Sequence, residues 1–397
     1  HLRSSNVMIE FHEEEMDPNA DPKTTTKHPI TRTVSLVVGL VVVAMGFTGR
    51  VVIVSSLPNF LGVKPAAPLA ITTSNELFDK HWTEIQEVLC PAEVPNTALG
   101  PTLFAMAGAE LGISSERINS LKQQQFDSQD PTSTKTLTYQ FYHGRFANAA
   151  IYINGNHTIA YIPIWKAANN AIRQWMKTLG TLQYVRPERL FGASLNDMKP
   201  SCVVTAVRDP ISHFLSGYNE IEYRKDSINN NTLLPSYYNM PFDRQDQRQD
   251  RFAQFVRDIV EGESRALLHL PFSHVFSMSR VLEALSRNGG VWSGYLPSIA
   301  NLSTEFPTFF KNTCKLEEDL PAMKDTRWQH KSSHDPEGFY QSAKTVWAEG
   351  GEVARALCML HAMDYACWKN LPDGIPKLCK DVYSSSAFIT SIAPSTP

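Results

Sequence analysis

The sequence predicts an α/β fold, in which a central parallel sheet is covered on both faces by helices. Short apolar segments typical of buried strands alternate with segments of helical spacing, and two of these strands run through polar turns directly into helices. Parallel sheets bury both faces, and their ligands bind beyond the carboxyl ends of the strands. The two turns therefore mark the place where a ligand is expected.

The composition is that of a globular protein with a packed core. The chain has 397 residues, 42% of them hydrophobic, which is enough for one large or two ordinary domains. Its formal net charge of −3 provides no general basic surface. Nucleic-acid binding therefore has no support from the composition.

Residues 34–57 are almost entirely apolar and are interpreted as one transmembrane helix. At about 1.5 Å per residue the segment can cross a hydrocarbon core about 30 Å thick, although Arg50 interrupts it. Lys23, Lys27 and Arg32 precede the segment, whereas the first fifteen residues after it carry one lysine. This asymmetry places the N-terminus in the cytosol. A cleaved signal sequence and a buried helix are the alternatives.

The other segments are assigned relative to this anchor. The polar start is expected to be a cytosolic tail, and the proline-containing stretch after the span a stem. The Ser-, Thr- and Pro-rich end is expected to be disordered. The predicted boundaries are residues 1–33 for the tail, 34–57 for the anchor, 58–74 for the stem, 75–383 for a lumenal domain and 384–397 for the disordered end.

All six cysteines follow the apolar span and share whatever compartment the main domain occupies. An oxidising lumen permits disulfides, whose connectivity the sequence does not give, and Cys358, Cys367 and Cys379 are placed to staple the C-terminal end. Cys202, in an expected core strand, is predicted to be a buried thiol. The scattered histidines and the lack of a CxxC pair argue against a metal site. Three N-glycosylation sequons follow the span and agree with a lumenal domain, at Asn156, Asn230 and Asn301.

Several further elements are expected between the stem and the C-terminus. A helix begins near Asn75, because apolar residues from Leu77 to Leu89 recur at helical spacing. Polar composition predicts a loop at residues 112–135 and an insertion at residues 243–251. Alternating composition predicts short strands at residues 136–143 and 148–155, and residues 252–260 have a helical pattern.

The most informative motif follows an apolar strand at residues 201–207. Its residues are Arg208, Asp209, Pro210, Ser216 and Tyr218. Arg208 and Ser216 can grip one phosphate, because a guanidinium supplies a planar fork of donors and a serine hydroxyl supplies one more. Asp209 fits the N-cap of the following helix, and Pro210 fits its first position.

A second anion site is expected upstream. A buried strand from Ile159 leads to a tight turn that carries Lys166, and a helix starts near Asn169. Backbone amides at a helix N-terminus attract an anion, and the lysine adds a point charge. Two phosphate sites are thus predicted between residues 159 and 223.

These segments resemble the membrane-bound carbohydrate sulfotransferases of the Golgi, which use 3′-phosphoadenosine 5′-phosphosulfate as donor. The resemblance implies a P-loop-like three-layer fold, although no GxxxxGK[ST] sequence is present. It also implies a type II Golgi membrane protein that transfers a sulfuryl group to a glycan hydroxyl in the lumen. The residues implied to hold the 5′-phosphosulfate are Lys166, Ala167, Ala168, Asn169 and Asn170, and those implied to hold the 3′-phosphate are Arg208, Ser216 and Tyr218.

Four positions depart from the family pattern and leave an alternative open. Asn169 and Asn170 stand where Thr or Ser is common, His213 replaces a second arginine, and Gln174 stands where many relatives have Glu. A protonated histidine still donates to phosphate. The alternative is a catalytically degenerate, membrane-anchored binding protein. A kinase function has little support because the sequence has no Walker A motif, and a glycosyltransferase function has little support because it has no clear DxD motif.

The expected chemistry needs a cation and a base. Lys166 is the candidate for stabilising the charge that builds on the leaving phosphate. The acceptor hydroxyl needs a general base, for which the candidates are His274, Glu220 and Glu222, followed by His143 and His157. The sugar, the hydroxyl position and the oligomeric state are left open.

Overall fold

The structure is a computed structural model, and all residues that it describes lie within the unit Ala70–Pro397. The described residues are 74–124, 136–143, 148–154, 157–180, 182–185, 190, 199–224, 235–262, 265–268, 270–324, 335 and 337–393. The expected cytosolic tail and anchor, and residues 58–73 of the stem, lie outside them. Within the described part, none of the helices combines the length and the apolar character that crossing a bilayer requires.

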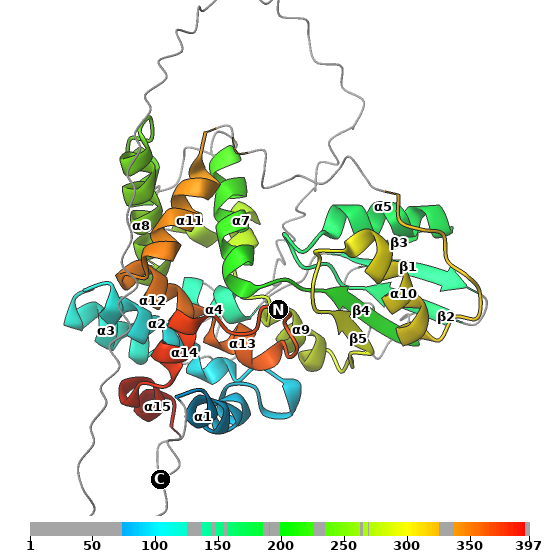
Figure 1. Cartoon of the computed structure of the whole chain (residues 1–397), viewed down its shortest axis with the longest axis horizontal. Coiled ribbons are helices and arrows are strands. Elements are labelled where there is room, and N and C mark those ends of the chain that lie inside the picture. Colours follow the sequence, from blue (N-terminus) through cyan, green and yellow to red (C-terminus); the bar gives the residue numbers. More distant parts are fainter. Residues whose placement is uncertain are drawn as a thin grey trace, which may run out of the picture. The chain divides into compact units, whose positions relative to one another are not determined.

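The fold is α/β and contains a mixed sheet of five strands (Figure 1). The strands are β1 (Ala149–Asn154), β2 (His157–Tyr161), β3 (Leu182–Val185), β4 (Cys202–Ala206) and β5 (Gly294–Leu296), in the order β3-β1-β2-β4-β5. β2 pairs with β4 and β4 with β5 in parallel, as predicted, whereas β1 is antiparallel to both β2 and β3. Only two residues separate β1 from β2, and so short a connection can join only antiparallel strands. The expectation of a purely parallel sheet is therefore wrong at β1.

Helices make up most of the rest of the described part. They are α1 (Ser74–Leu89), α2 (Gly100–Glu110), α3 (Ser115–Lys122), α4 (Leu137–Tyr142), α5 (Asn169–Leu179), α7 (Pro210–Tyr223), α8 (Gln245–Glu261), α9 (Arg280–Arg287), α10 (Leu302–Cys314), α11 (Phe339–Glu349), α12 (Glu352–Leu360), α13 (Ala362–Cys367), α14 (Lys377–Tyr383) and α15 (Ser386–Ile392). Short 3₁₀ segments join them, of which η7 (Leu270–Val275) matters most for the site.

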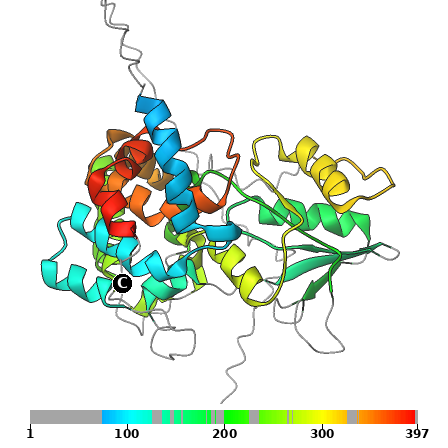
Figure 2. The ribbon, with the colours of Figure 1, turned by 90° about the horizontal axis from the view of Figure 1, so that it is seen from below.

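The two faces of the sheet contribute to two separate apolar clusters. Along β4, Val204 points into a cluster with α5 and α10, and Val203 points into the cluster formed by most of the other helices, because successive strand residues face opposite sides. α5 and α10 lie side by side over one face (Figures 1 and 2). The ring of Trp175 meets the ring of Phe310 edge to face there, with 5.4 Å between centroids.

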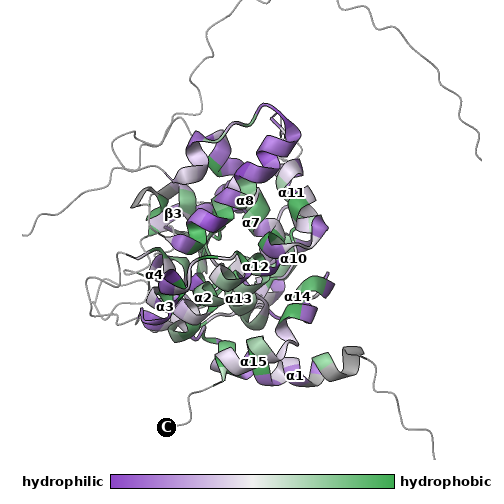
Figure 3. Ribbon diagram, turned by 90° about the vertical axis from the view of Figure 1, so that its left-hand side faces the viewer, coloured by the Kyte–Doolittle hydropathy of each residue, from purple (hydrophilic) through white to green (hydrophobic). Residues whose placement is uncertain are grey.

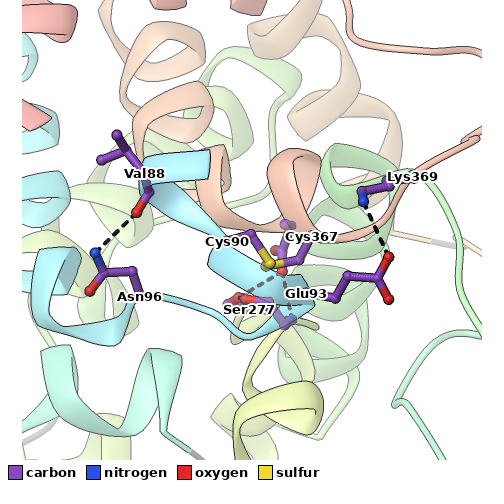
Figure 4. Close-up of a disulfide and its surroundings, with 9 residues drawn as sticks. Val88, Cys90, Glu93, Asn96, Ser277, Cys367 and Lys369 are labelled. Atoms are coloured by element: carbon purple, nitrogen blue, oxygen red, sulfur yellow. Dashed lines mark hydrogen bonds and ion pairs between the residues drawn. A yellow bond between two sulfur atoms is a disulfide. The ribbon is translucent and has the colours of Figure 1, made fainter. Parts of the chain in front are cut away.

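All six cysteines form disulfides, Cys90–Cys367, Cys202–Cys314 and Cys358–Cys379. Cys202 is thus not the free thiol that the sequence predicted: it faces α10, whose last residue is its partner, with 5.4 Å between the two Cα atoms. Cys358 and Cys379 staple the C-terminal end as expected. Cys367 instead reaches back to Cys90, at the end of α1 (Figure 4).

Four segments differ from their predicted local structure. Residues 136–143 form helix α4 rather than a strand, since Thr136 caps it by accepting from the amide of Tyr139. The expected loop at 112–135 contains α3, which Ser114 caps. The polar residues 243–251 contain the first turns of α8, and the end expected to be disordered contains α15, where Phe388 is buried.

Polar composition misled the prediction at α8. The first turns of α8, residues 245–251, are entirely hydrophilic, and its hydrophobic residues begin at Phe252 (Figure 3). Arg251 is fully buried and pairs with the equally buried Glu222 of α7, with 2.8 Å between Nε and Oε1. A polar run therefore supplies a buried ion pair that only the tertiary structure reveals.

Candidate functional site

The lysine turn connects β2 to α5 and has an unusual backbone. Lys166 and Ala168 both have φ of +61°, and the helix begins at Asn169. Left-handed residues that alternate with right-handed ones direct backbone N–H groups into one concavity, an anion-binding nest of the kind found in phosphate loops. The first N–H groups of α5 also lack intrahelical partners. The turn therefore has the backbone geometry of an anion site.

The side chains of this turn play different parts. Ala167 is buried and its amide donates to the carbonyl of Ile164 at 3.2 Å, so it closes the turn rather than facing a ligand. Asn169 is 5% exposed, and neither atom of its side-chain amide has a hydrogen-bond partner among the described residues. Such unsatisfied buried amides are rare in folded proteins. Asn170 is exposed.

Arg208 joins the two predicted motifs. It follows β4, and its Nη1 donates to the main-chain carbonyl of Lys166 at 3.1 Å. Burial lowers the pKa of this guanidinium, an effect that Tyr340 and Asp209 oppose. Among the described residues no carboxylate lies at ion-pair distance from it. Its remaining N–H donors are therefore left for an anion beside the lysine turn.

The start of α7 is fixed as the sequence predicted. The carboxylate of Asp209 caps the helix by accepting from the amide of Ser212 at 2.7 Å, and Pro210 is the first helical residue. The other carboxylate oxygen of Asp209 accepts from the hydroxyl of Tyr365 at 2.8 Å. Sequence reasoning missed Tyr365, because nothing near it in the chain marks it as a partner of a residue 156 positions away.

Only part of the predicted α7 set faces the site. Ser216 and Glu220 are four residues apart and share one face of the helix, and Glu220 contacts Lys166. Tyr218 lies about 200° around the helix from Ser216. Its fully buried ring packs 4.8 Å from that of Phe255 in the core. The structure thus places the ring of Tyr218 in the core rather than on the face of α7 that carries Ser216 and Glu220.

Lys166 and Glu220 form the central ion pair of the site. The Nζ of Lys166 lies 2.5 Å from Oε2 of Glu220, whose Oε1 lies 2.5 Å from Nε of Arg224. Burial alone would raise the pKa of Glu220, but the two cations outweigh it and hold this pKa at about 2. Burial lowers the pKa of Lys166 in turn, and Glu220 opposes that effect. Glu220 thus belongs to the site but is a poor proton acceptor in this arrangement.

His274 is brought to the same place by η7, which crosses α7. Its Nδ1 lies 2.7 Å from the carbonyl of Pro271 and donates to it, so the lone pair resides on Nε2. Its ring lies 5.1 Å from that of Trp165, the residue before Lys166. The pKa of His274 is lowered to about 4, mainly by burial and in part by the charge of Lys166, against the opposing effects of the hydrogen bond to Pro271 and of Glu220. His274 is therefore neutral at neutral pH and able to accept a proton.

The other predicted candidates lie elsewhere or act differently. Glu222, the other glutamate candidate for the base, is fully buried in the ion pair with Arg251. Burial lowers the pKa of His213 well below its usual range, so this neutral side chain does not replace an arginine cation. His143 stacks on Tyr139 and lies 3.2 Å from Glu283. His157 is exposed at the first residue of β2, the end of that strand opposite the lysine turn.

No known protein family, curated protein or solved structure matches the chain. The assignment of the site therefore depends on the geometry of these residues and on the motifs in the sequence.

The contact between α7 and η7 yields a testable prediction. A Cβ atom on Gly217 would lie 2.2 Å from the main-chain oxygen of His274, so Gly217→Ala must displace η7 or the helix. We expect a loss of about 2 kcal/mol or more in the free energy of unfolding, measured with urea. Gly108→Ala in α2 is the matched control, because its Cβ would meet only side-chain atoms at 3.5 Å and beyond. Equal stability of the two variants would contradict the close crossing.

Proposed function

We propose that this chain transfers a sulfuryl group from 3′-phosphoadenosine 5′-phosphosulfate to a hydroxyl of a glycan. The observation that carries the proposal is the hydrogen bond from Arg208 to the carbonyl of Lys166, which joins the two phosphate motifs in one place. A donor with phosphates at both the 3′ and 5′ positions needs two such cationic anchors. The P-loop-like architecture is part of this proposal, supported by two strand-turn-helix units on the parallel strands β2 and β4.

In this proposal Lys166 exchanges partners when the donor binds. Its ammonium contacts Glu220 in the structure, and the 5′-phosphosulfate offers a competing anion at the nest of the lysine turn. Charge grows on the bridging oxygen as the sulfur–oxygen bond breaks, so a cation there stabilises the transition state more than the ground state. Arg208 and Ser216 hold the 3′-phosphate.

His274 receives the proton of the acceptor hydroxyl in this scheme. The acceptor oxygen forms its new bond to sulfur while the bond from sulfur to the 5′-phosphate breaks, leaving adenosine 3′,5′-bisphosphate. The proton passes to Nε2 of His274, whose orientation the Pro271 carbonyl fixes. The departure of Lys166 towards the donor would free Glu220 from one cation, which makes this carboxylate the second candidate base.

A type II orientation with a lumenal domain in the Golgi belongs to the same proposal. Three disulfides that use all six cysteines support an oxidising compartment, since cytosolic thiols are kept reduced. The apolar segment 34–57 and the sequons after it support the anchor.

A degenerate binding protein is the second candidate. Two observations favour it: Gln174 is an exposed amide of α5 where a catalytic glutamate is common in the resembling family, and His213 is neutral. Such a protein would bind the nucleotide without transferring sulfate.

The transfer assay separates these candidates. We expect the purified chain to transfer label from the phosphosulfate donor to a member of a glycan panel. Lys166→Ala and Arg208→Ala should each reduce donor affinity about 10- to 100-fold, because a lost charge-assisted hydrogen bond costs about 1.5–3 kcal/mol. Lys311→Ala and Arg257→Ala are matched controls, because both side chains pair with carboxylates on other elements. Donor binding without transfer favours the degenerate protein, and no donor binding refutes both.

His274 gives a separate prediction on pH. Because its pKa in the free protein is about 4, the neutral base is present above pH 4, and kcat/KM should fall only as the pH drops through that value. His274→Gln should lower kcat about 100-fold or more at neutral pH while donor affinity stays unchanged. His157→Gln is the control, an exposed histidine at the opposite end of β2. An unchanged kcat in His274→Gln would exclude it as the base.

A further inference from the structure

A third buried cation lies close to the site but belongs to neither phosphate motif. Arg280 is the first residue of α9 and is only 8% exposed. Its side chain lines a small cavity whose wall also includes Trp165, His213 and Ser273. Trp165 directly precedes Lys166, and Ser273 directly precedes His274, so the cavity adjoins both reactive elements of the proposed site.

Arg280 is not neutralised by its surroundings. Among the described residues it makes no hydrogen bond and has no carboxylate at ion-pair distance, and its guanidinium carbon lies 5.1 Å from the centre of the Phe276 ring. Burial lowers the pKa of Arg280 to about 10, an effect that the charge of Asp364 opposes. The side chain is therefore still a cation at neutral pH.

Asp364 is already occupied by other donors. Its Oδ1 accepts from the hydroxyl of Ser277 and the amide of Ser279, both at 2.7 Å, and its Oδ2 lies 2.7 Å from Nδ1 of His361. The charge of this carboxylate raises the pKa of Arg280, but the carboxylate accepts no hydrogen bond from it. All five N–H donors of the guanidinium remain without a partner in the described part of the chain.

A buried cation without hydrogen-bond partners lowers the free energy of unfolding, and a bound anion can supply the missing partners. The planar fork of a guanidinium matches carboxylate and sulfate oxygens in bidentate fashion. We propose that Arg280 forms an oxyanion site, separate from Lys166 and Arg208, that receives a carboxylate or sulfate group carried by the acceptor. The assignment of the occupant to the acceptor rests on the proposed function, because the two phosphate motifs account for the donor.

The test measures binding of small acidic sugars without any donor nucleotide. Sodium glucuronate and sodium glucose 6-sulfate are titrated into the purified full chain by calorimetry at constant ionic strength, with glucose as the neutral comparison. We expect saturable binding of at least one acidic sugar, at least 10-fold tighter than glucose, and its loss in Arg280→Gln. The acidic sugar that binds more tightly shows whether the acceptor group at Arg280 is a carboxylate or a sulfate.

Two further variants keep the result interpretable. Arg287→Gln removes a positive charge from the same helix at a residue that pairs with Glu283 and is 44% exposed, so it should bind the sugar like the unmodified chain. Arg280→Lys keeps the charge but lacks the planar fork of donors, so it should bind the acidic sugar at least 5-fold more weakly than the unmodified chain. This variant keeps the test decisive if Arg280→Gln does not fold. Three results would overturn the proposal. They are equal affinity of Arg280→Lys and the unmodified chain for the acidic sugar, equal affinity of the unmodified chain for glucose and the acidic sugar, and no binding of either acidic sugar.

Titration of adenosine 3′,5′-bisphosphate into the same proteins separates this proposal from the function it rests on. Arg280→Gln should bind the nucleotide normally. Loss of nucleotide binding in that variant would show that Arg280 serves the donor and would overturn the assignment. If the unmodified chain binds the acidic sugar but no nucleotide, the oxyanion site is supported and the proposed function is refuted.

Discussion

The hydrogen bond from Arg208 to the carbonyl of Lys166 is the constraint on which the rest of the site depends. It links the end of β4 to the turn after β2, two strands that are neighbours and parallel in the sheet. The turn itself is strained, since Lys166 and Ala168 occupy the left-handed region without being glycine. A guanidinium donating into that turn holds it in a conformation that the sequence alone does not favour, while most of its donors stay available.

The short helix α13 supports both the start of α7 and the segment next to His274. Tyr365 donates to Asp209 at the start of α7, and Asp364 accepts from Ser277 and Ser279 after η7. The disulfide from Cys367 to Cys90 fastens the end of this helix to the end of α1, close to Ser277 (Figure 4). A segment near the C-terminus thus positions groups that lie about 90 and 155 residues earlier in the chain. We infer that the described part of the chain works as one folded unit rather than as separable halves.

Local patterns predicted the elements that depend on neighbouring residues. The strands β1, β2 and β4, the helix from Asn75 and the N-cap Asp209 follow from short stretches of sequence. The position of Lys166 beside Arg208 was expected from the family resemblance, because the two residues are 42 positions apart. Partners distant in the sequence decided other positions: Cys202 pairs with Cys314, Glu222 pairs with Arg251, and the ring of Tyr218 packs in the core. The direction of β1 and the helix at residues 137–142 were missed because pairing and burial, not composition, decided them.

In the proposed function, one nucleotide is held at both ends by Lys166 and Arg208. Calorimetric comparison of adenosine 3′,5′-bisphosphate with adenosine 5′-monophosphate on the purified chain tests it most directly. We expect one site per chain and an affinity at least about 10-fold higher for the bisphosphate, since the 3′-phosphate adds charge-assisted bonds of about 1.5–3 kcal/mol. Equal affinities for the two nucleotides, or no binding of either, would contradict it.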